Sequence, residues 1–399
     1  MVSSLIRYMV IITGLLFASF SAASDNPLQD VQIPETVNPA LDYLLSQAVA
    51  GHSPAIDSAA IAPVFEFVLS SKDKNNLYYP GNRSNISSAY HEFEIHKGIK
   101  HILDLGFNPD IPPFILSPSC IRLTYWTEVN GTNQAIPLFS SLLSHLDQPV
   151  IVNGAEHEEI TPDLNTGAYY GYDMDRTIIL MTYQGRPALI SISKQKNISD
   201  VGKKGVVLGK DDNWDYFYSG QSGLTKPGLG WVNSYMYDSY GISVFFELNA
   251  GQPLVRCGIF KWLRAGWADM NMVQNKHIYR GLERYASTVK QVLESPFLPE
   301  PQKMAETFSA IKALSTNELR DKIKNYITQL SLKYGNESST EGKLIAETMK
   351  SGNYIDQLNP YQMQSILSVE YMKYLLGKKT IQDMVYFIPP NETDLQRKS

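Results

Sequence analysis

The stretch that decides the fold is residues 177–193, TIILMTYQGRPALISIS. Two runs rich in β-branched and other apolar residues, 177–183 and 188–193, flank a Gln-Gly-Arg-Pro sequence that suits a turn. This pattern predicts a β-hairpin. A second pair of runs, 242–248 and 254–260, flanks the turn sequence NAGQP in the same way. The middle of the chain is therefore expected to form an antiparallel sheet.

A long amphipathic helix is expected directly after this sheet, from Asn275 to Ser295. Its apolar residues recur at spacings of three to four and form one stripe: Ile278, Leu282, Tyr285, Val289 and Leu293. Such a stripe has to be covered, and the strands on either side of residues 249–253 supply the nearest apolar surface. The fold class predicted from these features is α+β, with an antiparallel β-sheet packed against a long amphipathic helix.

Changes in pattern divide the chain into four regions. We expect a signal peptide at 1–23, a mixed α and irregular region at 24–118, the sheet and long helix at 119–295, and a helical C-terminal module at 302–388. Clustered prolines between Ser295 and Gln302 separate the last two regions. Within the module, capping-box sequences begin at Ser315 and Ser338, and Asn359-Pro360 is another helix start.

The N-terminus carries the three parts of an export signal. Arg7 precedes an apolar run, Tyr8 to Phe20, which ends in the small residues Ser21-Ala22-Ala23. A spanning helix needs about 20 apolar residues, and this run is shorter. We therefore expect cleavage after Ala23 and a periplasmic or secreted protein.

Intact-mass measurement of the exported protein tests this expectation. The mature chain should begin at Ser24 or within a residue or two of it, because the small-x-small sequence ends there. Retention of residues 1–23 would contradict the expected processing.

Composition limits the partners and the chemistry of the chain. The formal charge is −5, and loss of Arg7 with the signal peptide makes it −6. An acidic chain has no general attraction for phosphate backbones, so nucleic acid is not an expected partner. The two cysteines, Cys120 and Cys257, could pair in an oxidising compartment or remain as buried thiols, and the pattern leaves both alternatives open.

One group of residues resembles a set of metal ligands. It contains His91, Glu92, Glu94, His96 and His101. Its spacing matches no zinc signature, and a charged strand face in water explains it equally well. We expect no metal, no cofactor and no catalytic residue, although a hydrolase that uses this group is an alternative. The sequence does not decide whether the chain is an enzyme.

Aromatic residues concentrate in the predicted sheet and at its exit. Broad apolar rings with polar tips suit a pocket for an amphipathic ligand, and a packed aromatic core is the alternative. A buried arginine needs a carboxylate or a ligand head group, so we expect arginine to mark the polar end of such a pocket or to point to solvent. The candidate binding residues are Arg176, Trp231, Tyr235, Arg256, Trp262 and Trp267, with the last two expected near the mouth.

The segment from Ala168 to Pro299 is similar, in the order of its elements, to the second half of START-like, helix-grip lipid-binding domains. The likeness lies in residues 175–179, which open the hairpin, in the strand 242–248, and in residues 267–273, which lead into the long helix. It covers about a third of the chain, and neither the N-terminal region nor the helices after Pro301 has a counterpart. The resemblance implies a curved sheet that grips a helix around an apolar cavity.

The leading hypothesis is an exported protein that binds a lipid-like small molecule in a pocket between sheet and helix. The first alternative is the exported hydrolase described above, with or without a metal. The second is a structural or interaction protein whose C-terminal helices bind a protein partner.

Overall fold

The computed structural model describes residues 28–48, 56–81, 83, 85–131, 136–163, 167–226, 230–249, 252–336, 338–350 and 354–381. The expected signal peptide lies outside these residues. Among the described residues, no helix combines the length and the apolar character needed to cross a membrane.

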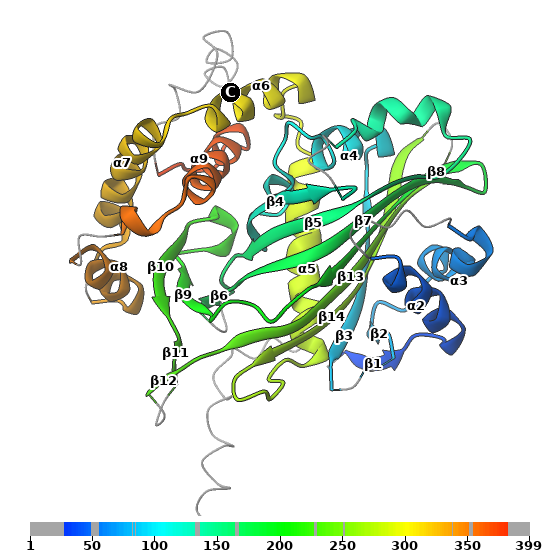
Figure 1. Ribbon diagram of the computed structural model, residues 1–399, viewed down its shortest axis with the longest axis horizontal. Coiled ribbons are helices and arrows are strands. Elements are labelled where there is room, and N and C mark those ends of the chain that lie inside the picture. Colours follow the sequence, from blue (N-terminus) through cyan, green and yellow to red (C-terminus); the bar gives the residue numbers. More distant parts are fainter. Residues whose placement is uncertain are drawn as a thin grey trace, which may run out of the picture.

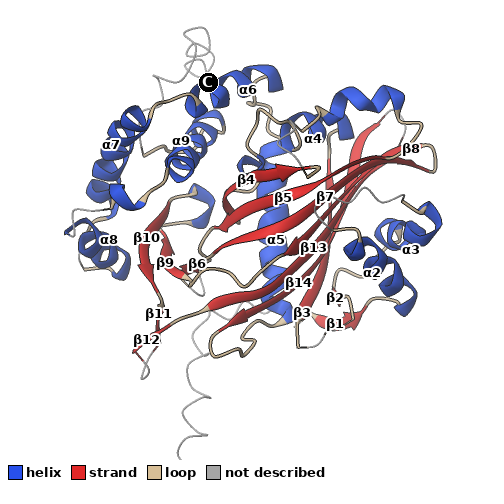
Figure 2. Ribbon diagram, viewed as in Figure 1, coloured by secondary structure: helices blue, strands red, loops and turns tan. Residues whose placement is uncertain are grey.

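A seven-stranded antiparallel sheet forms the centre of the molecule (Figure 1). The strand order is β3-β14-β13-β8-β7-β5-β4. In that order the strands span Ser87–Ile95, Gln252–Gly266, Tyr235–Asn249, Arg186–Gln195, Gly171–Tyr183, Val150–Ile160 and Ile121–Val129. Helices lie on both sides of this sheet and beyond its β4 edge (Figure 2). The predicted α+β class is confirmed.

Both predicted hairpins are present in the sheet. Strands β7 and β8 pair through Tyr183 and Arg186 around a two-residue turn, in which Gln184 and Gly185 have φ of 49° and 72°. Positive φ at both turn positions matches the right-handed twist of the flanking strands. Strands β13 and β14 are longer than the sequence indicated, and residues 261–266, expected after the sheet, continue β14.

Successive residues of the central strands pack into different layers. On β7, Ile179 belongs to a core shared with α2 (Asn38–Ser46) and α3 (Ser58–Leu69), whereas Ile178 and Leu180 belong to the core shared with α5. Neighbouring side chains on a strand point to opposite faces, so burial of both faces requires a nearly continuous apolar run. This explains the sequence TIILM.

The long helix α5 spans Asn275–Leu293 and lies behind the sheet in Figure 1. A reciprocal capping box between Gln274 and His277 fixes its start. The predicted stripe faces the sheet, with Tyr285 partly buried and Ile278, Leu282, Val289 and Leu293 buried. The expected packing of helix on sheet is therefore confirmed.

Shorter elements surround this framework. They are β1 (Gln29–Gln32), η2 (Glu35–Val37), β2 (Asn76–Tyr79), α4 (Ile99–Gly106), η3 (Pro113–Leu116), η4 (Phe139–His145), β6 (Ala168–Tyr169), β9 (Lys203–Val207), η5 (Asp211–Asn213), β10 (Tyr216–Ser222), β11 (Leu224–Lys226) and β12 (Gly230–Val232). Strands β10, β9 and β6 form a separate sheet. The region expected to be helical and irregular also contributes β3, the edge strand beside β14.

The C-terminal helices pack beside the β10-β9-β6 sheet and strand β4 (Figure 1). They are α6 (Pro301–Lys312), α7 (Thr316–Tyr334), α8 (Thr340–Lys350), η6 (Ile355–Gln357) and α9 (Pro360–Leu375). The capping box predicted at Ser315 is confirmed, and the helix start predicted at Asn359 is confirmed and also forms a capping box. Buried Lys373 of α9 binds Asp215 at 2.5 Å and Glu370 at 2.6 Å. The apolar core of α5 and the sheet continues into these helices.

Candidate functional site: a cavity between the sheet and helix α5

A cavity of about 2330 Å³ lies between the inner face of the sheet and helix α5. The predicted stripe of α5 forms one wall, and strands β4, β5, β7, β8, β13 and β14 form the other. Small-molecule pockets commonly measure roughly 300–1,000 Å³, so this space exceeds what most such ligands need.

The strand wall changes from apolar to charged along the strands. One row across the sheet contains Leu180, Leu189, Phe245 and Cys257, of which Phe245 lines the cavity. The next inward-facing row contains Ile178, Ser191, Ser243 and Ile259, and the row after it Arg176, Ser193, Gly241 and Lys261. Since each row is two residues from the last, the apolar and charged rows are separated by about 13 Å.

The apolar end of the cavity is aromatic. The rings of Phe107 and Phe139 lie 6.3 Å apart, and those of Phe107 and Phe245 lie 6.0 Å apart, all measured between centroids. All three side chains line the cavity. This end can receive a hydrocarbon group without leaving polar atoms unpaired.

The charged row and the next residues of β5 hold the best-defined polar contacts. Arg176 Nε donates to Glu156 Oε2 at 2.7 Å, and its Nη1 donates to Ser191 Oγ at 3.2 Å. Burial alone would lower the pKa of Arg176, but the carboxylate of Glu156 raises it above its ordinary value. The side chain of Arg176 keeps 19% of its surface exposed because it borders the cavity.

A second acidic group lies beside this pair. The hydroxyl of Tyr172 donates to Glu158 Oε1, and burial raises the pKa of that hydroxyl well above its ordinary value. Across the sheet, Lys261 Nζ donates to Ser239 Oγ at 2.7 Å. Four charged side chains, two of each sign, therefore line this part of the cavity wall.

One opening of the cavity lies beside the loop 267–274, which joins β14 to α5 and which we call the mouth loop. Of the cavity-lining residues here, Met272, Gln274 and Lys276 are exposed. Ala268 and Asp269 both have positive φ, 51° and 58°, which is uncommon for residues with a side chain.

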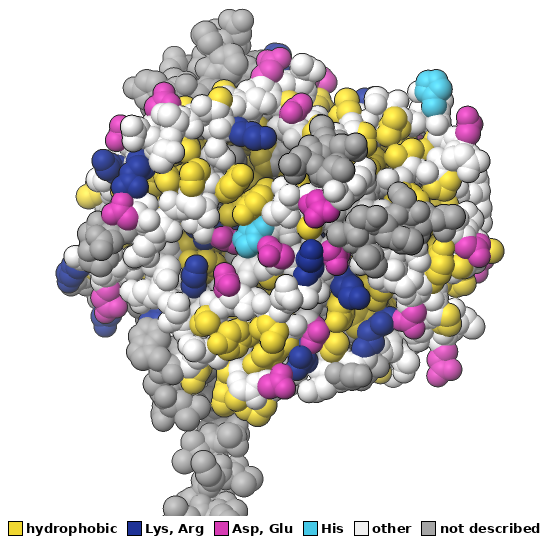
Figure 3. Space-filling view, viewed as in Figure 1, with side chains coloured by type: hydrophobic (Ala, Val, Ile, Leu, Met, Phe, Trp, Pro, Cys, Tyr) yellow, Lys and Arg dark blue, Asp and Glu magenta, His cyan; other side chains and the backbone are white. Residues whose placement is uncertain are grey.

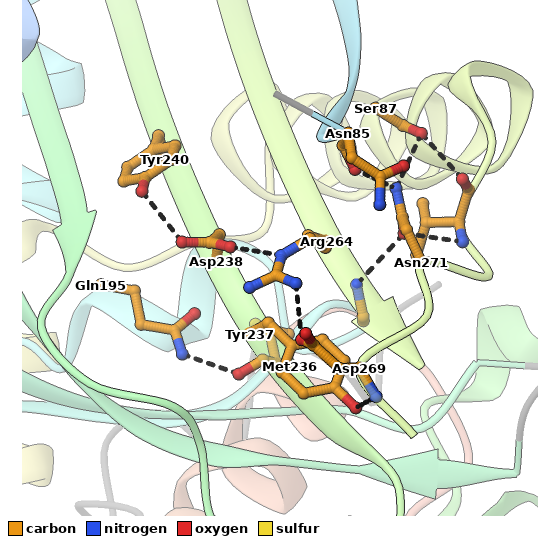
Figure 4. Close-up of polar contacts among 12 residues, drawn as sticks. Asn85, Ser87, Gln195, Met236, Tyr237, Asp238, Tyr240, Arg264, Asp269 and Asn271 are labelled. Carbon is orange, nitrogen blue, oxygen red and sulfur yellow. Dashed lines mark hydrogen bonds and ion pairs between the residues drawn. The ribbon is translucent and has the colours of Figure 1, made fainter. Parts of the chain in front are cut away.

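Polar contacts from several segments hold the mouth loop in this conformation (Figure 4). Arg264 binds Asp238 at 2.6 Å and Asp269 at 2.8 Å, and the hydroxyl of Tyr237 accepts a hydrogen bond from the backbone of Asp269 at 2.9 Å. Asn271 Nδ2 donates to Asn85 O at 3.0 Å. Contacts within the chain therefore fix the shape of the opening.

The structure brings two of the predicted binding residues to the cavity. Arg176 lines its polar wall, and Trp267 lies at the mouth loop. The position expected for Trp262 is wrong: its side chain is buried in the core shared with α2 and α3, because it alternates with inward-facing Lys261. Tyr235 does not line the cavity and lies near Tyr237.

Of the remaining two candidates, Arg256 lies away from the cavity and Trp231 has a side chain that the structure does not describe. Arg256 binds Glu94 at 2.5 Å and Leu69 O at 3.3 Å, on the sheet face that carries α3. Trp231 belongs to β12, and its side chain lies outside the described residues.

Sequence reasoning did not single out four polar residues of the cavity wall: Glu156, Glu158, Tyr172 and Lys261. Glu156 and Glu158 carried a usable signal, since acids two residues apart on a strand share a face. Lys261 was missed because β14 was expected to end before it.

The group from His91 to His101 is dispersed over several contacts. Glu92 accepts from Tyr90 and Glu94 pairs with Arg256, whereas His91 packs against Tyr279 on the opposite sheet face. Burial lowers the pKa of His91 to about 4. Within the part of the chain that the structure describes, no three His, Cys, Asp or Glu residues form a group that could hold a metal ion. Both Cys120 and Cys257 are free thiols.

Comparison with known proteins gives little to add to this geometry. No protein-family model and no curated protein matches the sequence. Among solved structures, the chain is similar to the human StarD13 (DLC2) lipid transfer and protein localization domain. The match has 10% sequence identity, covers 61% of this chain and 100% of that domain, and has a TM-score of 0.26. A TM-score this low does not establish a shared fold.

The Glu156–Arg176 pair yields a stability prediction. Arg176→Met should lower the free energy of unfolding at pH 7 by about 2–4 kcal/mol, because it leaves a buried carboxylate without its partner. Burial raises the pKa of Glu156, so its ionisation costs stability as the pH rises through the carboxylate range. The deficit should therefore be smaller at pH 5 than at pH 7 when urea unfolding is followed by tryptophan fluorescence.

Arg256→Met is the matched control for this prediction. Its pair with Glu94 is more exposed, so the loss should stay below about 1 kcal/mol. The double variant Glu156→Met/Arg176→Met should recover much of the stability. Equal losses for the two arginine variants would contradict the role of the buried pair.

Proposed function

We propose that the protein binds an amphipathic, lipid-like molecule in the cavity between the sheet and helix α5. The single observation that carries the proposal is the graded wall, aromatic at Phe107, Phe139 and Phe245 and charged at Arg176 and Lys261. A ligand with an apolar body and a polar head can satisfy both ends at once.

The direction of the wall suggests how such a ligand lies. On β14, Lys261 precedes Trp267 of the mouth loop by six residues, whereas the Phe245 row lies further from that loop. The polar head would therefore lie nearer the mouth and the apolar body nearer α4. The hydrogen bonds that hold the mouth loop favour this mode of binding, because few residues there would lose conformational freedom when a ligand enters.

The surroundings in which the protein would act are also part of this proposal. An N-terminal export signal would place it in the periplasm or outside the cell, where lipid-like molecules need a carrier to move through water. On the face seen in Figure 3, acidic and basic side chains are interspersed with apolar ones. A protein partner that binds the C-terminal helices is compatible with this role.

Titration with a dansyl-labelled fatty acid tests the proposal. Binding should be saturable and should quench tryptophan emission by energy transfer, because Trp126 and Trp267 both line the cavity. Ser243→Phe should weaken binding at least tenfold, about 1.4 kcal/mol, since its side chain would fill the middle of the cavity.

Ser287→Phe is the matched control, because Ser287 is exposed on α5 and does not line this cavity. It should bind the probe as the parent protein does. Absence of saturable binding to the parent protein, or equal effects of the two phenylalanine variants, would remove the cavity as the binding site.

A further inference from the structure

We infer that the ligand of this cavity carries an anionic head group, a carboxylate or a phosphate monoester, and that Lys261 is its counter-ion. This inference rests on the proposed function and narrows the class of amphipath that the cavity takes. Its basis is the position of one cation among the four charged groups of the wall.

Lys261 reaches the cavity without a carboxylate of its own. It lies on the inward face of β14, and its Nζ donates one hydrogen bond to Ser239 Oγ on the neighbouring strand. Among the described residues, no acidic side chain forms an ion pair with it. An ammonium group has three N–H donors, so two remain to be satisfied by water or a ligand.

Neither carboxylate of this part of the wall forms an ion pair with Lys261 among the described residues. Glu156 binds Arg176 at 2.7 Å, and Glu158 accepts the hydroxyl hydrogen of Tyr172. Arg176 therefore has an internal counter-ion, whereas Lys261 has a hydroxyl as its partner. Of these two cations, Lys261 is the one whose buried charge a bound anion would stabilise more.

The charges that act on Lys261 agree with this assignment. Burial lowers its pKa, attraction by Glu158 opposes that change, and repulsion by Arg176 adds to it. From helix α5, Tyr285 faces the same space, and burial raises the pKa of its hydroxyl so that it stays uncharged. An anion bound beside Lys261 would stabilise the protonated amine.

Gly241 leaves room for a head group beside Lys261. It occupies the position between Ser193 and Lys261 in the charged row. A Cβ atom there would come within 2.9 Å of Ser193 Oγ and 3.8 Å of Lys261 Cδ. Because glycine has no side chain, this position leaves more space next to Lys261 than any other residue would.

Competition among three amphipaths of equal chain length tests the inference. Palmitate, hexadecyl phosphate and hexadecanol are each used at pH 7 to displace a neutral anthroyloxy-labelled fatty alcohol from the full protein. The parent protein should prefer at least one of the two anions over hexadecanol by about tenfold or more. A preference for palmitate would identify a carboxylate, and one for hexadecyl phosphate would identify a phosphate.

Variants then assign that preference to the lysine. Lys261→Met should bring the anion to within about threefold of hexadecanol, and Lys261→Arg should keep most of the preference. Lys194→Met is the matched control, because Lys194 is an exposed lysine of β8, on the strand face opposite to Ser193. It should leave the preference of the parent protein unchanged.

The outcomes separate this inference from the proposed function. If the parent protein binds the neutral probe and all three competitors displace it equally, the ligand class is wrong and the cavity remains a binding site. Persistence of the anion preference in Lys261→Met would likewise overturn the role of Lys261. If neither probe nor competitors bind, the proposed function fails and this inference fails with it. The parent ratio is measured first, so the test does not depend on how well a variant folds.

Discussion

The structure depends on the central sheet, whose two faces are both covered by helices. One face is closely packed, and the other borders a large cavity. Helices α2 and α3 pack closely against one face, with Phe65 and Phe246 in a continuous apolar core. Helix α5 packs against the other face at its β3 and β14 edge and leaves a large cavity over the remaining strands. Close packing would stabilise the fold further, because protein interiors are normally filled to crystal-like density. A cavity of this size therefore indicates that the protein binds a molecule there.

The charged side chains of the cavity wall indicate what kind of molecule the cavity binds. The Glu156–Arg176 pair neutralises itself, and a buried pair of this kind contributes little net stability compared with apolar residues of the same volume. Lys261 adds a cation that the chain leaves without an ion pair among its described residues. Groups that cost stability and lie together in a cavity are typical of binding sites.

Much of the framework follows from the sequence, and the site follows less well. Period-two and period-3.6 patterns located the β7–β8 hairpin, the helix α5 and its apolar stripe, because those patterns report burial directly. They did not locate the end of β14, since each face of residues 261–266 mixes polar and apolar side chains, Lys261 with Leu263 on one face and Trp262 with Arg264 on the other. Trp262 was misplaced for that reason. The rule that a buried arginine needs a partner selected both Arg176 and Arg256, and of these only Arg176 lines the cavity. The contact between Arg176 and Glu156 could not be predicted, because it depends on which residues of β5 and β7 lie opposite each other and no local sequence pattern indicates that register.

The central claim is that the cavity holds an amphipathic molecule in the working protein. Native mass spectrometry of the mature protein, purified from its own source without detergent, tests it most directly. The account predicts a population heavier than the polypeptide by the mass of one small molecule, which organic extraction releases as an amphipath. A mass equal to that of the bare polypeptide throughout, together with an extract free of such molecules, would contradict it.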